Sequence, residues 1–311
     1  MVDRAQNETA SRFEGVVALL LTPFQPDGQI DWKCYEAYVD WQLSLGVKAL
    51  FAVCGSSEMK WLSFSERLEL ARRAVSRAGR IPVITTANLE PNPAEHKAEL
   101  HRLIDTGVSG VVLVPPPGLA RDQVLLGEYF AELADTSSCP VFLYEWPQVW
   151  PYSISPSVFR NLVRNHGVLG IKDTTCTIEG IVAKIRAAPE AIVYQANTPL
   201  ALDAVEAGAR GMMAITSTCC ADLAVKFWQL ALGKAQETKR VHARLVFLDA
   251  ILRMAHPATS KYLAALRGIP ISPTCRWPVT LHAEVARAVR VWFEEYLEDH
   301  SEANSRLPSF R

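Results

Sequence analysis

Short apolar runs recur along the chain, and longer segments with apolar residues at every third or fourth position separate them. Each run is continuous rather than alternating, which is typical of parallel strands covered on both faces. The pattern predicts eight strands, at Gly15–Leu21, Val47–Val53, Ile81–Ala87, Gly110–Pro116, Pro140–Trp146, Val168–Lys172, Ala191–Ala196 and Gly211–Ile215.

The segments between these runs carry signals for helix starts. Asp31 is placed to cap the first helix, and Ser63 with Glu66 matches a capping box ahead of the second. Asn92 precedes Pro93, which suits the first position of the third helix. Strand and helix alternate with a mean period of about 28 residues, the usual length of one βα unit in a barrel.

An open, doubly wound sheet would show the same alternation. Eight units and the absence of a GxGxxG turn favour an α/β fold of the closed (β/α)8 type, the TIM barrel. We expect residues 1–220 to form the barrel core, with its eighth helix continuing to about residue 233. Residues 234–311 have helical spacing and are expected to form a C-terminal helical extension packed on the barrel.

Composition narrows the range of functions. The net charge of −1 argues against nucleic acid and anionic membranes as main partners. The chain has no apolar stretch of membrane-spanning length, and its polar N-terminus lacks a signal-peptide core, so we expect a cytoplasmic protein. The seven cysteines include no CxxC pair and are expected to be reduced thiols.

The active site of a barrel enzyme lies at the carboxyl ends of the strands, where Lys172 ends the sixth apolar run. If Lys172 points inward, Ile171 and Asp173 point toward the helices. Desolvation at the barrel mouth would lower the pKa of this lysine, and a free amine can form a Schiff base with a carbonyl. Position alone leaves open a structural lysine, ion-paired with Glu145 or Asp173.

Five segments in order resemble the dihydrodipicolinate synthase / N-acetylneuraminate lyase superfamily of class I aldolases and lyases. They are "LTPFQPDGQID" (21–31), "GSSEMKWLSFSER" (55–67), "YEWP" (144–147), "GIKD" (170–173) and "HPATSKYLAALRG" (256–268), where the family has "NP…K..L...G" in the last. The resemblance implies that Lys172 forms a Schiff base with a 2-oxo acid. It also implies that Tyr144 moves protons at the substrate as general acid and base.

The same resemblance implies the substrate contacts. Ser56 and Ser57, with their backbone amides, would hold the substrate carboxylate. Thr174 would face the substrate, and Ile215 would pack on the pyruvate moiety. No cofactor is expected. No metal is expected either, because His96 and His101 would face different directions on a helix.

Other stretches depart from the family pattern. Dihydrodipicolinate synthases carry an arginine shortly after the strand-five tyrosine and paired tyrosines after strand four, and this chain has neither. Neuraminate lyases have acidic residues after strand seven, where "QANTP" stands here. The strand-two loop is one residue shorter, which puts the place of Glu58 in doubt. Trp146, Gln148 and Trp150 would rebuild the far end of the site for a ring or a sugar chain, or simply form an apolar loop.

These features predict a lyase, foremost a pyruvate-dependent aldolase that cleaves or forms a 2-oxo-3-deoxy (sugar) acid. Dehydration of such an acid and a dihydrodipicolinate synthase-type condensation use the same iminium and stay open. A non-catalytic barrel that binds an oxo acid is the alternative from another class. Because family members commonly form dimers or tetramers, we expect a homodimer or homotetramer.

Overall fold

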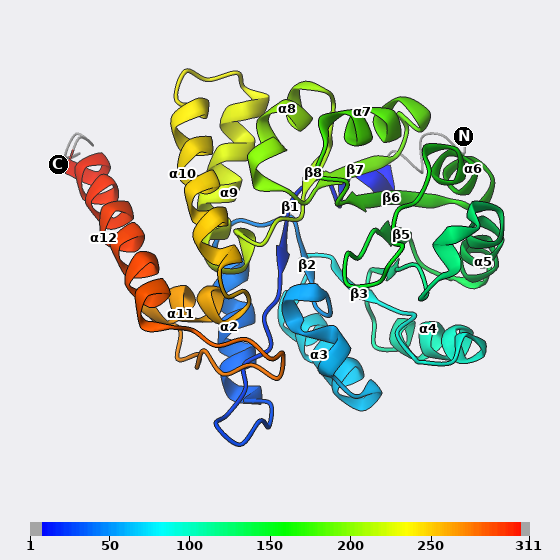
Figure 1. Ribbon diagram of the computed structural model, residues 1–311, viewed down its shortest axis with the longest axis horizontal. Coiled ribbons are helices and arrows are strands. Elements are labelled where there is room, and N and C mark those ends of the chain that lie inside the picture. Colours follow the sequence, from blue (N-terminus) through cyan, green and yellow to red (C-terminus); the bar gives the residue numbers. More distant parts are fainter. Residues whose placement is uncertain (1–7, 306–311) are drawn as a thin grey trace.

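Eight parallel strands close into a barrel in chain order, with β8 paired to β1, in a computed structural model that describes residues 8–305 (Figure 1). This confirms the expected (β/α)8 barrel. The strands are β1 Gly15–Leu19, β2 Ala49–Phe51, β3 Val83–Thr86, β4 Gly110–Leu113, β5 Val141–Tyr144, β6 Val168–Asp173, β7 Ile192–Gln195 and β8 Gly211–Met212.

Helices follow the strands around the outside of the barrel. They are α2 Trp32–Ser44, α3 Phe64–Ala78, α4 His96–Ile104, α5 Gln123–Thr136, α6 Pro156–His166, α7 Ile178–Ala187, α8 Ala201–Glu206 and α9 Ser217–Leu232. The expected caps are present: Asp31 accepts from the amide of Cys34 at 2.9 Å, and Ser63 and Glu66 form the capping box. Asn92 caps the 3-10 turn Pro93–Glu95, which leads into α4.

The register of the barrel decides which side chains face its interior. Tyr144 on β5 pairs with Lys172 on β6, and Lys172 pairs with Tyr194 on β7, so these three share a face. The rings of Phe142 and Tyr194 lie 6.1 Å apart, and the Tyr194 hydroxyl donates to the carbonyl of Phe13. Aromatic rings therefore fill the amino-terminal end of the barrel, and Lys172 lies toward the opposite, carboxyl end.

The C-terminal helices form a layer beside the barrel. After α9, which packs on β1, come α10 Thr238–Arg253, α11 Ala258–Leu266 and α12 Ala283–Ser305. Figure 1 shows α12 as the outermost of them, and it contacts α10 and α11. The expected boundary near residue 233 falls between α9 and α10, and the division into two parts stays a prediction. No helix within residues 8–305 is long and apolar enough to cross a membrane.

Candidate active site

Lys172 lies near the end of β6 with only 5% of its surface exposed. Its Nζ is 4.1 Å from the centroid of the Tyr144 ring and 5.9 Å from that of Phe51. Burial lowers the pKa of this lysine from 10.5 to about 8. Water is removed from the ammonium group, and the faces of two aromatic rings compensate only part of that loss.

The neighbouring carboxylates do not pair with Lys172. Lys184 of α7 forms ion pairs with both carboxylates instead. Its Nζ is 2.7 Å from Asp173 Oδ2 and 3.0 Å from Glu145 Oε1, and all three side chains are buried. Asp173 therefore points toward the helices, as the strand alternation predicts. The alternative of a structural Lys172, ion-paired with Glu145 or Asp173, is contradicted by these contacts.

Glu145 also fixes the backbone around the site. Its carboxylate accepts hydrogen bonds from the amides of Ile154 at 2.8 Å and Thr174 at 3.3 Å. Burial and the neighbouring Asp173 raise its pKa, and the ammonium group of Lys184 opposes that shift. The buried triad thus joins the loop after β5 to the end of β6, the two strands that carry Tyr144 and Lys172.

The Tyr144 hydroxyl lies against the turn that follows β2. A Cβ atom built at Gly55 would be 3.3 Å from this hydroxyl and 3.6 Å from Nε1 of Trp146. A side chain at position 55 would press on both groups, so glycine allows the phenol its close approach to the turn. Burial raises the pKa of Tyr144 well above its usual value, and the phenol is protonated in the free protein.

The turn itself is the short 3-10 helix Gly55–Ser57, and its two serines differ in their contacts. Ser57 donates its hydroxyl to the carbonyl of Leu20 at 2.6 Å, and its amide bonds to the carbonyl of Cys54. Ser56 has its hydroxyl 3.0 Å from Nε2 of His256. Within residues 8–305 the Gly55 and Ser56 amides have no hydrogen-bond partner. Ser57 anchors the turn, and the free donors belong to its two preceding residues.

Two other predicted substrate contacts are near the strand ends. Thr174 donates its hydroxyl to the carbonyl of Glu145. Ile215 is half-buried and packs against the core. These contacts leave open whether Ser57, Thr174 and Ile215 touch a substrate, and their roles stay predictions.

Glu58 is fully buried although the strand-two loop is short. Its carboxylate is 2.6 Å from Nζ of Lys261 and accepts from the amides of Arg276 and Trp277 at 2.7 Å each. Lys261 also donates to the carbonyl of Thr274 at 2.7 Å. The loop after β2 is therefore held in place by α11 and the segment that follows it.

Sequence reasoning assigned no role to His256. It lies between α10 and α11, and its Nε2 contacts Ser56, 200 positions away along the chain. The available signal was the histidine before Pro257, where the family segment has asparagine. Arg253, one helical turn earlier, is half-exposed and is 3.5 Å from Oδ1 of Asn197, which follows β7.

The two tryptophans that follow β5 differ in their exposure to solvent. Trp146 is buried beside Gly55, whereas Trp150 is 75% exposed and packs edge-on against Tyr152. Gln148 between them is half-buried. Trp146 therefore lies beside the turn that carries Gly55, whereas the Trp150 ring faces outward.

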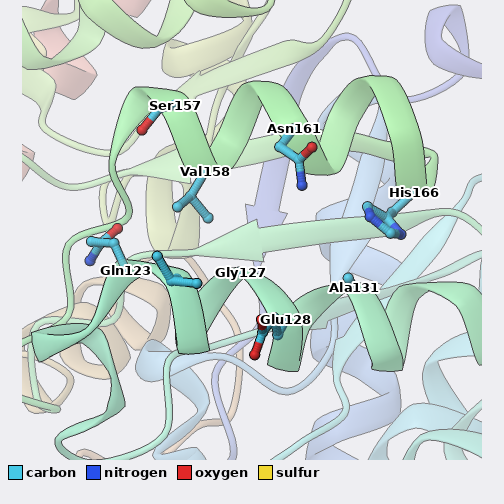
Figure 2. A pocket seen from close by; sticks show the side chains of 9 residues that line it. Gln123, Gly127, Glu128, Ala131, Ser157, Val158, Asn161 and His166 are labelled. Atoms are coloured by element: carbon cyan, nitrogen blue, oxygen red, sulfur yellow. The ribbon is translucent and has the colours of Figure 1, made fainter.

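A groove with a volume of 490 Å³ lies elsewhere, on the outside of the barrel. Figure 2 shows that it is lined by α5, with Gln123 and Glu128, and by α6, with Val158, Asn161 and His166. No strand end contributes to its lining. It is separate from the site around Lys172.

A closed (β/α)8 barrel with a buried lysine and a phenol at its carboxyl end is the arrangement of class I, Schiff-base enzymes. Comparison with known proteins supports this assignment. The model of the "Dihydrodipicolinate synthetase family" matches residues 12–291, and the chain belongs to this family. It is therefore a class I lyase of the kind that joins or cleaves 2-oxo acids such as pyruvate.

Two curated relatives carry the name 4-hydroxy-tetrahydrodipicolinate synthase. The one from Saccharophagus degradans is 27% identical over 89% of this chain and 97% of its own length. The one from Gluconacetobacter diazotrophicus is 28% identical over 88% of this chain and 94% of its own.

Solved structures show the same fold. A prophage protein of E. coli K12 from the dihydrodipicolinic acid synthase family, solved with pyruvate, has a TM-score of 0.84 and 22% identity, over 91% of this chain and 98% of its own. The 4-hydroxy-tetrahydrodipicolinate synthase of Methylacidiphilum fumariolicum SolV has a TM-score of 0.86 and 23% identity, over 94% and 98%.

Proposed function

We propose that Lys172 forms a Schiff base with a 2-oxo acid and that the protein is a pyruvate-dependent aldolase of 2-oxo-3-deoxy acids. The observation that carries the proposal is the state of Lys172: it is buried, and within residues 8–305 no carboxylate pairs with it. With a pKa of about 8, roughly one molecule in ten carries the free amine at pH 7. At the ordinary lysine value of 10.5 only about one in three thousand would.

The reaction follows from that amine. It attacks the C2 carbonyl of the substrate and water leaves, which gives a cationic iminium. The iminium accepts the electron pair of the C3–C4 bond as that bond breaks, the C4 hydroxyl loses its proton, and an aldehyde departs. The remaining enamine takes up a proton at C3, and hydrolysis releases pyruvate and the amine. The reverse sequence forms the longer acid.

Tyr144 is proposed to carry the proton. Its phenol is protonated in the free protein, because burial raises its pKa. A cationic iminium on Lys172, beside the same ring, would lower that pKa and make proton exchange possible once the Schiff base forms. Ser56 and the free amides of the strand-two turn are proposed to hold the substrate carboxylate, with Ser57 keeping the turn in shape.

Condensation of the dihydrodipicolinate synthase type is the second candidate, because two curated relatives bear that name. Against it, the segment from Tyr144 to Tyr152 contains no arginine for a second carboxylate. Arg253, which is ion-paired with Asp249 and lies 3.5 Å from Asn197, is proposed to meet a charged or hydroxylated substrate tail. A homodimer or homotetramer and a cytoplasmic location remain predictions.

Borohydride trapping with pyruvate tests the proposal. Peptide mapping after reduction should find the adduct on Lys172. Lys184 is a matched internal control, because it is equally buried but paired with two carboxylates. Absence of any adduct on Lys172 would make the protein an oxo-acid-binding barrel without iminium chemistry. A screen of 2-oxo acids for pyruvate release, water loss or condensation then separates the reactions.

A further inference from the structure

His256 links the candidate carboxylate site to the C-terminal layer. Its Nε2 lies 3.0 Å from the hydroxyl oxygen of Ser56, and its Nδ1 lies 2.9 Å from that of Ser260 on α11. The imidazole thus stands between two hydroxyl groups, one in the turn after β2 and one in a helix beyond the barrel.

The burial of Ser260 determines the direction of these two hydrogen bonds. Ser260 is fully buried, and within residues 8–305 its hydroxyl has Nδ1 of His256 as its only partner. A buried hydroxyl proton without an acceptor is costly. A neutral imidazole can accept from only one of the two hydroxyls. Ser260 is fully buried, whereas Ser56 keeps 4% of its surface exposed, so the cost of an unbonded hydroxyl proton is greater at Ser260. Ser260 therefore donates to Nδ1, and the single ring proton of the neutral imidazole is on Nε2.

The tautomer determines what Ser56 can do. The Nε2–H group of His256 donates to the oxygen of Ser56, which leaves the proton of that hydroxyl for another acceptor. Ser56 is 4% exposed, and no other acceptor for its hydroxyl is present within residues 8–305. With the opposite tautomer, the Ser56 hydroxyl would donate to Nε2 of His256 and could not donate to a substrate.

The surroundings keep the imidazole neutral. Burial, followed by the positive charges of Lys172, Lys261 and Arg253, lowers the pKa of His256 to about 3. A protonated ring would carry hydrogen on both nitrogens and could no longer accept from Ser260.

We propose that His256 is a positioning residue, which Ser260 holds in one tautomer so that the Ser56 hydroxyl donates to the carboxylate of the 2-oxo acid. This inference rests on the proposed function and adds the two residues, His256 and Ser260, that orient the Ser56 hydroxyl toward the carboxylate. His256 acts through Ser56 and takes no proton from the substrate.

The test is the concentration of pyruvate that half-saturates borohydride trapping on Lys172. His256→Leu and Ser56→Ala should each raise it about tenfold, which corresponds to about 1.4 kcal/mol. The double variant should be no weaker than Ser56→Ala alone, because both changes remove the same interaction. Trapping of acetone, a ketone without a carboxylate, should change less than about twofold in the same variants.

Conservative variants separate positioning from damage to the fold. Gln can place an amide N–H near the position of Nε2, so His256→Gln should recover most of the affinity that His256→Leu loses. Asn reaches only as far as Nδ1, and His256→Asn should resemble His256→Leu. If His256→Leu fails to fold, this Gln and Asn pair decides the question.

The outcomes separate the two proposals. Wild-type protein that pyruvate does not label refutes the proposed function. Wild-type labelling with unchanged half-saturation in the His256 variants refutes this inference alone. Equal losses for pyruvate and acetone, or fully additive losses in the double variant, also refute it, because His256 would then act on the site as a whole.

Discussion

Replacement of Lys172 by methionine should stabilise the protein at neutral pH, although it removes the proposed Schiff-base residue. Burial lowers the lysine pKa from 10.5 to about 8, so the folded state binds this proton more weakly than the unfolded state does. The free energy cost of holding the charge is therefore fully present below pH 8 and is lost as the pH rises to about 10.5. It amounts to about 3 kcal/mol at pH 7, about 2 kcal/mol at pH 9 and less than about 1 kcal/mol at pH 10.

The decisive quantity is the change in the stability difference between Lys172→Met and the wild type. Packing differences between the two side chains add the same amount at every pH, and other titrating groups cancel. In urea unfolding, the stability that Lys172→Met gains over the wild type should therefore be about 2–3 kcal/mol smaller at pH 10 than at pH 7.

Lys33→Met, at an exposed lysine of α2, is the matched control and should differ from the wild type by less than about 0.5 kcal/mol at both values. A stability difference for Lys172→Met that does not vary with pH would refute the reasoning.

Other changes give distinct outcomes. Tyr144→Phe should keep borohydride trapping but slow the exchange of pyruvate methyl protons with D2O, followed by NMR, by about a hundredfold or more; exchange at the wild-type rate would remove the phenol from the proposed mechanism. Gly55→Ala places a methyl group 3.3 Å from the Tyr144 hydroxyl and should slow the same exchange about tenfold. Gly127→Ala in α5 meets only Val158, at 3.5 Å, and should instead stabilise the fold by about 0.5–1 kcal/mol with exchange unchanged; equal behaviour of the two alanine variants would contradict the assigned contacts. Lys184→Met leaves two buried carboxylates without their cation and should lower the free energy of unfolding in urea by about 3–5 kcal/mol. A decrease of less than about 1 kcal/mol would show that Lys184 is not needed to neutralise them.

The barrel could be predicted because burial on both faces leaves a direct mark on the sequence: eight continuous apolar runs. The residues at which the strands begin and end could not be predicted. Val47–Val53 reads as one run, but only Ala49–Phe51 forms β2, and β8 is reduced to Gly211–Met212. Hydropathy records which residues are buried, whereas a strand ends where its hydrogen bonds to neighbouring strands end.

Lys172 could be singled out because a cation at the end of a buried strand conflicts with its surroundings. Its freedom from Glu145 and Asp173 could not be derived from their short separation along the chain. That freedom depends on Lys184, which reaches both carboxylates from α7.

The contact between His256 and Ser56 was equally out of reach, because it joins residues 200 positions apart. Pairings that depend on how distant segments meet at the barrel mouth leave no local pattern. The histidine before Pro257 was visible in the sequence, but its partner was not.

The central claim is that the amine of Lys172 loses its proton far more readily than an ordinary lysine. Titration of lysines labelled at the side-chain ε position, followed by heteronuclear NMR, measures the pKa of this amine directly. The signal that is missing in Lys172→Met identifies Lys172. A midpoint near pH 8 is the predicted result. A midpoint near 10.5 would mean that the ammonium group is as stable in the barrel as in water, and the proposed chemistry would lose its basis.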